Sequence, residues 1–346
     1  MIKQTQKSGD QSENISAGRD VVKVGLSLEE ARTVAIGVYN ENIYKLVGIA
    51  QDIIESRVHD FTEKALNSII SENPENLVSL CDPDFQSAFY EAQKTYVKSG
   101  NESLEQNLLI LLKDRSNKTN TDFHRIVLNE SINTVSKLTD RQLNILSIVY
   151  FFDFAKMNIP INFDIFCHEL EKIVLPLTSN IIVNRNDFLH FEYTGCGSRN
   201  QSRYNLLSLI IESYRGLFLK GVERRHQNDI SYLEENNLII PCINNPELIQ
   251  INALSLANLN TKLEGLPFSE NQKQAARNFF NNTHQIDLQE IKNRIISIKP
   301  FMLKVFDLYE QLELNQLFLT SIGISLAASN IERLSGVKTN LEKVLQ

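Results

Sequence analysis

Apolar residues recur with the spacing of an α-helix through most of this chain, and the longest such stretch begins just after Ser27. Ser27 and Glu30 form a capping-box pattern, in which the serine hydroxyl accepts from a backbone amide and the glutamate reaches back. The helical spacing continues until Asn73-Pro74, which signals a stop. We therefore expect one helix over most of residues 28–72, about 65 Å long at 1.5 Å per residue. Such a helix can act as an oligomerisation stalk or cross a helical bundle.

Capping and stop signals predict further helices. Pro83 stands at a first helical position, Gly100 ends the same pattern, and Thr139 precedes a strongly apolar helix. Two segments instead carry β-hairpin signatures, residues 181–193 and 238–251, and each follows two predicted helices. Helix, helix, hairpin is the order of elements in a winged-helix unit.

These elements indicate a mainly α-helical fold. We expect a helical bundle with a long N-terminal helix, a short N-terminal β segment and one or two winged-helix-like units. A chain of 346 residues is long enough for two or three domains. The expected division is residues 1–26 as a β-prone assembly segment, 27–136 as an all-helical body, 137–198 as a winged-helix-like unit, 199–266 as a second such unit and 267–346 as C-terminal helices.

The residues between Lys7 and Val24 read as turn, strand, turn, strand. An isolated hairpin is marginal in water, and its open edges would accept the same segment from another copy. We therefore predict a homo-oligomer built by strand addition; the alternative is a floppy, polar N-terminal tail. The residues predicted to carry assembly are Gly9, Asp10, Ile15, Gly18, Asp20, Val22 and Val24.

Charge and cysteine usage narrow the class of protein. The formal net charge of −7 argues against a chain-wide electrostatic grip on nucleic acid or on an anionic membrane. Four cysteines are scattered without a C-x-x-C pair, which is the usage of a reducing compartment. No signal-peptide pattern opens the chain and no run of 18 apolar residues occurs in it. We therefore expect a cytoplasmic protein without a membrane partner.

Cysteine and histidine offer the first candidate chemistry. Cys167, His190 and Cys196 are candidate metal ligands, but their spacing matches no zinc module, and His168 beside Cys167 points about 100° away on a helix. Cys196 stands between two glycines and could present a nucleophilic thiol, although a turn with a half-buried cysteine explains the same pattern. Phosphate-binding, dinucleotide, metalloprotease and nucleophile-elbow motifs are absent. We therefore favour a non-enzymatic protein without a cofactor, with a cryptic metal- or cysteine-dependent enzyme as an alternative.

A basic cluster offers a second kind of site. It falls just before the presumed second helix of the second winged-helix-like unit, where phosphate contacts would be made. Acidic residues interrupt it, and winged helices also serve as protein-packing modules. The nucleic-acid candidates are Arg215, Lys220, Arg224 and Arg225.

Several segments together resemble an uncharacterised family of bacterial proteins. The segments are the Gly-Asp opening, Asp82 to Arg115, Leu128 to Ser131 with Leu138 to Asp140, Tyr193 to Gly197, and Leu319 to Ile324. The block before residue 150 is also distantly similar to the Abi-alpha proteins of abortive phage infection. The resemblance implies a bacterial protein, makes phage defence a hypothesis for its role, and supplies no catalytic residues.

The leading hypothesis is a self-assembling interaction protein, a sensor or adaptor in bacterial phage defence, whose partners are itself and an unidentified protein. A nucleic-acid-binding regulator that uses the winged-helix-like units is the alternative from a different class.

Overall fold

The computed structural model describes residues 27–42, 51–179, 181–200, 205–224, 230–311 and 314–339. The seven residues predicted to carry assembly, from Gly9 to Val24, lie outside these ranges. Their role therefore stays a prediction. The described part of the chain is mainly α-helical, as expected.

The chain turns back on itself between α1 (Leu28–Asn42) and α2 (Gln51–Glu72). The Arg32 guanidinium contacts the Glu63 carboxylate, Nε to Oε1 at 2.6 Å and Nη2 to Oε2 at 3.0 Å. In one straight helix these residues would be about 46 Å apart. The single helix expected over residues 28–72 is therefore wrong, although the capping box is confirmed by the bonds between Ser27 and Glu30. Two antiparallel helices bury both apolar stripes in one core.

Three further helices complete this end of the molecule. They are α3 (Pro83–Ser99), α4 (Glu102–Arg115) and α5 (Asp122–Thr134), with the 3-10 turns η1 (Pro74–Cys81) and η2 (Val135–Lys137). The Asp82 carboxylate caps α3 by accepting from the Asp84 amide at 3.1 Å. Gly100 ends the helix in the left-handed region, at φ 62°, where glycine has no steric cost. Both ends of α3 are therefore as predicted.

The middle of the chain is helical where the first hairpin was expected. Its helices are α6 (Asp140–Asp153), α7 (Phe163–Leu177), α8 (Arg185–Tyr193) and α9 (Leu206–Tyr214), followed by the turn η3 (Arg215–Leu217). The hairpin predicted over residues 181–193 is wrong, because the Asn184 side chain accepts from the amides of Asn186 and Asp187 and so begins α8. The winged-helix-like unit proposed for residues 137–198 therefore has no hairpin at that position.

The second predicted hairpin is confirmed. Strands β2 (Ile239–Cys242) and β3 (Asn245–Ile251) are antiparallel, with Ile239 opposite Ile251. They pack with α10 (Ser231–Glu235), α11 (Leu256–Glu264) and α12 (Glu270–Asn282) around a small core of their own, which includes Leu233, Leu259 and Phe280. The winged-helix-like character of this second unit stays a prediction.

The last elements return to the centre. They are α13 (Leu288–Ile298), α14 (Met302–Gln311), the turn η5 (Leu314–Gln316), β4 (Leu317–Leu319) and α15 (Ser321–Ser335), and β4 pairs antiparallel with β1 (Gly197–Arg199). Every residue of α15 from Gly323 to Ile331 is buried. A Cβ built on Gly323 would lie 1.9 Å from the carbonyl oxygen of Cys196. Only glycine therefore lets the start of α15 approach that turn so closely.

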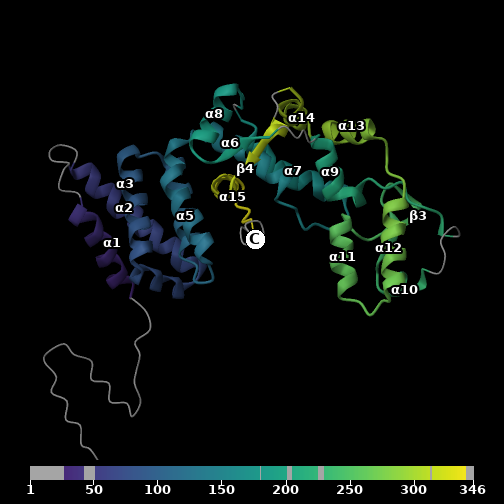
Figure 1. The fold of residues 1–346 in the computed structure, drawn as a ribbon, viewed down its shortest axis with the longest axis horizontal. Coiled ribbons are helices and arrows are strands. Elements are labelled where there is room, and N and C mark those ends of the chain that lie inside the picture. The colour runs from purple at the N-terminus through teal and green to yellow at the C-terminus, as the bar shows by residue number, and fades with distance from the viewer. Residues whose placement is uncertain are drawn as a thin grey trace, which may run out of the picture.

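Figure 1 shows the resulting arrangement, with α1 to α5 at one end, α10 to α12 at the other, and α6, α7 and α15 between them. The main core is continuous from α1 to α15, so the C-terminal helix joins elements from both halves of the sequence. Among the described residues, no helix is both long enough and apolar enough to cross a membrane.

Candidate binding cleft

A cleft of about 770 Å³ lies beside α6. One wall is the end of α6 and the loop that follows it, a second is α11, and a third is the segment 337–339 after α15. Clefts of this size hold small ligands or a few residues of a peptide. Its lining comes both from the central helices α6, α7 and α9 and from α11, which packs with the β2–β3 hairpin; Figure 1 shows where these helices lie.

Aromatic side chains at the end of α6 and just after it form one apolar part of the cleft. Tyr150 and Phe154 stack with ring centroids 6.1 Å apart, and Phe151 and Ile331 line the same hollow. Tyr150 is fully buried, and its hydroxyl has no hydrogen-bond partner among the described residues. Burial raises the pKa of this hydroxyl. The Thr339 hydroxyl, which is also buried, lies close enough to act against that rise, so this pair of side chains joins α6 to the segment after α15.

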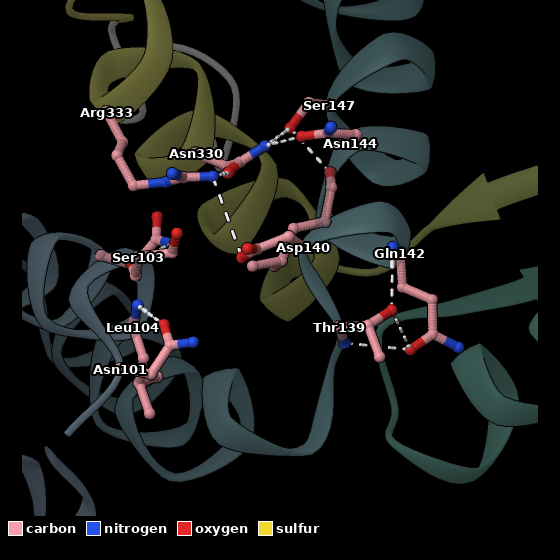
Figure 2. A network of polar contacts seen from close by, with 12 residues as sticks. Asn101, Ser103, Leu104, Thr139, Asp140, Gln142, Asn144, Ser147, Asn330 and Arg333 are labelled. Atoms are coloured by element: carbon pink, nitrogen blue, oxygen red, sulfur yellow. Dashed lines mark hydrogen bonds and ion pairs between the residues drawn. The ribbon is translucent and has the colours of Figure 1, made fainter. Parts of the chain in front are cut away.

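A buried polar network fixes α15 against α6, and Figure 2 shows how its side chains meet. The Asn330 amide nitrogen donates to Asn144 Oδ1 and to Ser147 Oγ, each at 2.9 Å. Asn330 Oδ1 accepts from Arg333 at 3.2 Å through Nε and 2.7 Å through Nη2. The two bonds to Arg333 lie within α15, but because Asn330 is completely buried, only one sliding position of α15 satisfies its two bonds to α6. The network therefore sets where α15 and α6 contribute to the cleft.

Ion pairs hold the segment that forms the third wall. Lys338 Nζ lies 2.6 Å from Glu72 on α2 and 3.8 Å from Asp114 on α4, and Lys113 pairs with Glu332 nearby. Burial raises the pKa of Asp114 to about 6, while the two lysines act against that rise. These ion pairs therefore hold the third wall of the cleft against α2 and α4.

The α11 wall presents neutral polar groups. Ser255 caps the helix by accepting from the Asn258 amide at 3.2 Å, and Asn258 Oδ1 accepts from the Leu254 amide at 3.2 Å. Thr261 follows on the next turn of the same wall. The charged lining residues are Lys156, Glu169 and Lys338, and Lys338 is already paired. The cleft is therefore nearly neutral, and its lining, all within the described ranges, contains no cysteine or histidine that could act as nucleophile or base.

The three candidate metal ligands are not brought together as a metal site. Cys167 and Cys196 are both buried, and burial raises the pKa of the Cys167 thiol to about 11 and also that of Cys196. His190 Nδ1 lies 3.0 Å from Gln142 Nε2, and its ring stacks on Tyr193. Across the ranges that the structure describes, no three His, Cys, Asp or Glu side chains are arranged to hold a metal ion. A thiol with a raised pKa is also a poor nucleophile at neutral pH.

The basic cluster is largely engaged within the molecule. The Arg215 guanidinium donates to Gln285 Oε1 at 2.9 Å and to two backbone carbonyls. Arg224 pairs with Glu234 at 2.6 Å. Lys220 is exposed, and Arg225 lies outside the described residues. Nucleic-acid binding by this cluster therefore stays a prediction.

Sequence comparison places the chain in a family. A protein-family model matches residues 25–345, nearly the whole chain. The chain belongs to that family. The family is uncharacterised, in agreement with the resemblance seen in the sequence, and its description gives no activity, ligand or partner. No curated protein and no solved structure matches the chain.

The cleft was not foreseen because its lining comes from distant segments. Tyr150, Ser213, Asn258 and Thr339 all contribute, and no local pattern relates them. The one signal available was the polar spacing of Ser255, Asn258 and Thr261 at three-residue intervals, which marks a polar helix face but not what faces it.

Proposed function

We propose that this chain is a non-enzymatic interaction protein that holds a segment of a partner polypeptide in the cleft. The observation that carries the proposal is the lining itself, in which aromatic and aliphatic side chains alternate with neutral polar ones around about 770 Å³. A polypeptide needs both, because its side chains bury apolar surface while its backbone amides and carbonyls require partners. The side chains of Ser213, Asn258 and Thr261 on its walls can supply such partners.

Charge supports a polypeptide over a phosphorylated ligand. Lys156 and Glu169 offset each other, and Lys338 is paired with Glu72. A phosphate group would need converging positive charge or several free backbone amides. A segment with few charges and one or two large apolar side chains suits the lining better.

The proposal keeps two expectations drawn from the sequence. Self-assembly through Gly9 to Val24 would present several copies of the cleft at once and raise affinity by avidity. A role as sensor or adaptor in phage defence is supported only by the resemblance of the sequence.

Site-specific photo-crosslinking in cells tests occupancy of the cleft. A benzoylphenylalanine is placed at Ala257, an exposed residue of α11 that lines the cleft, and at Ala275, an exposed alanine of α12 that does not line it. We expect discrete adducts from position 257 that are missing at position 275. For a partner found in this way, Ala257→Trp should weaken binding at least about tenfold, or about 1.4 kcal/mol, and Ala275→Trp should not. Identical adducts from both positions would contradict the proposal.

Light scattering tests assembly separately. The full chain is compared with a chain beginning at Leu26. We expect the full chain to be an oligomer and the shortened chain to have a smaller mass. Equal monomeric masses would refute self-assembly through the N-terminal segment without affecting the cleft.

A further inference from the structure

A second, much smaller cavity lies on another side of α6, where Asp153 is the last residue of the helix. Its volume is about 20 Å³, which is the room that one water-sized particle occupies. Asp153, Tyr309 of α14 and Asn315 of η5 line it, together with residues of β4. None of these residues belongs to the binding cleft.

Two side-chain oxygens at this cavity have no hydrogen-bond partner among the described residues. Tyr309 is only 1% exposed, and its hydroxyl has no hydrogen bond within the described residues. Asn315 Oδ1 is also buried and unpaired there. The Asp153 carboxylate lines the same cavity and is half-buried. Orphaned buried groups around one small cavity indicate a common guest.

The charge of Asp153 determines which ligand the cavity can bind. Burial raises the pKa of Asp153 to about 7, and the carboxylate stands at the negative end of α6, where the helix dipole opposes a second negative charge. A water molecule can complete the hydrogen bonds but leaves the charge of an ionised carboxylate unbalanced. A cation satisfies the oxygen lone pairs and neutralises the charge together.

We propose that the cavity is a binding site for one monovalent cation of about the size of water, such as K⁺ or NH₄⁺, with oxygens of Asp153, Tyr309 and Asn315 as ligands. A divalent ion fits less well, because one carboxylate does not balance two charges. Mg²⁺ also keeps several of its waters, for which this cavity has no room. The bound ion joins the end of α6 to α14 and to the turn that leads into β4, so it stabilises the base from which α15 begins.

Ion-dependent unfolding of the full chain tests the site. The melting temperature is measured at pH 8 and constant ionic strength while choline chloride is replaced by KCl, NH₄Cl or NaCl. We expect a rise of about 1–3 °C with the best-fitting ion. Asp153→Asn should abolish the rise, whereas Asp307→Asn should keep it, because Asp307 lies on α14 but does not line the cavity. Tyr309→Phe removes one ligand oxygen and should reduce the response even if Asp153→Asn folds poorly.

Protons should compete with the ion. Tyr309 is the titratable side chain that faces Asp153, and burial together with that carboxylate raises its pKa. Neighbouring Gln316 is neutral and accepts from Arg199 Nε at 2.7 Å. With Asp153 half-protonated near pH 7, the apparent ion affinity should fall about tenfold from pH 8 to pH 6. A Rb⁺-soaked crystal of the unaltered chain should show an anomalous peak between the three side chains.

Two results would overturn the proposal. Equal melting temperatures in KCl, NH₄Cl, NaCl and choline chloride, with no Rb⁺ peak, would mean that the cavity is a water site only. An undiminished ion response in Asp153→Asn would place the ion elsewhere.

Discussion

Replacing Asn330 with alanine should destabilise the protein by about 4 kcal/mol. The side chain makes two neutral bonds through Nδ2, at 2.9 Å each, and accepts two from the Arg333 guanidinium. Neutral bonds contribute about 1 kcal/mol each, and bonds to a charged group about 1.5–3 kcal/mol. Counting the guanidinium contacts as one interaction gives about 2 kcal/mol for Asn144 and Ser147 and about 2 kcal/mol for Arg333.

Urea unfolding followed by circular dichroism measures this change in the free energy of unfolding. The matched control is Asn278→Ala on α12, where an exposed side chain accepts one bond from Gln274. The control should change stability by less than about 0.5 kcal/mol. In a double-mutant cycle, Asn144→Ala and Asn330→Ala should couple by about 1–2 kcal/mol. A coupling energy near zero between Asn144→Ala and Asn330→Ala would refute the view that this network fixes α15 on α6.

Two further predictions concern the free energy of unfolding. Gly323→Ala should lower it by more than about 3 kcal/mol, because the new Cβ would lie 1.9 Å from the Cys196 carbonyl oxygen. Gly37→Ala should raise it by about 0.5–1 kcal/mol, because nothing lies within 4 Å of its Cβ and alanine favours the helix α1. Urea titration of both variants measures the two changes. The raised pKa of Asp114, about 6 against 3.8, means that the folded chain binds this proton more tightly than the unfolded chain, so stability should fall as pH rises from about 4 to 6. Asp114→Asn should remove that part of the slope and gain up to about 3 kcal/mol relative to wild type between pH 4 and pH 7; an equal difference at both pH values would contradict the assignment.

Local signals in the sequence predicted the helix ends well. The helix ends at Asp82, Gly100 and Thr139 each depend on contacts with one or two neighbouring backbone groups. Such short-range bonds do not depend on the rest of the fold, so the sequence alone suffices for them.

The two errors in the fold have a common cause. Residues 28–72 show one helical spacing, but spacing does not reveal where a chain reverses when both halves stay helical. In residues 184–187 the same Asn and Asp side chains suit a hairpin turn and a helix N-cap. A helix brings Phe188 and Phe191, three residues apart, to one face, where both are buried. That burial depends on tertiary contacts, which the local sequence does not show. The cleft depends on tertiary contacts even more, because it forms only when segments far apart in the sequence pack together.

The position of α15 has a consequence for synthesis. Asn330 is made 186 residues after Asn144, its partner, which at 5–20 residues per second is about 10–40 s later on the ribosome. Until α15 emerges, the faces of α4, α5, α6 and α7 that it covers are exposed to solvent. The nascent chain must therefore carry an open apolar groove for most of its synthesis, which makes it a substrate for chaperones that recognise such surfaces. Any change that delays or weakens the docking of α15 would lengthen this exposure before it altered the finished fold.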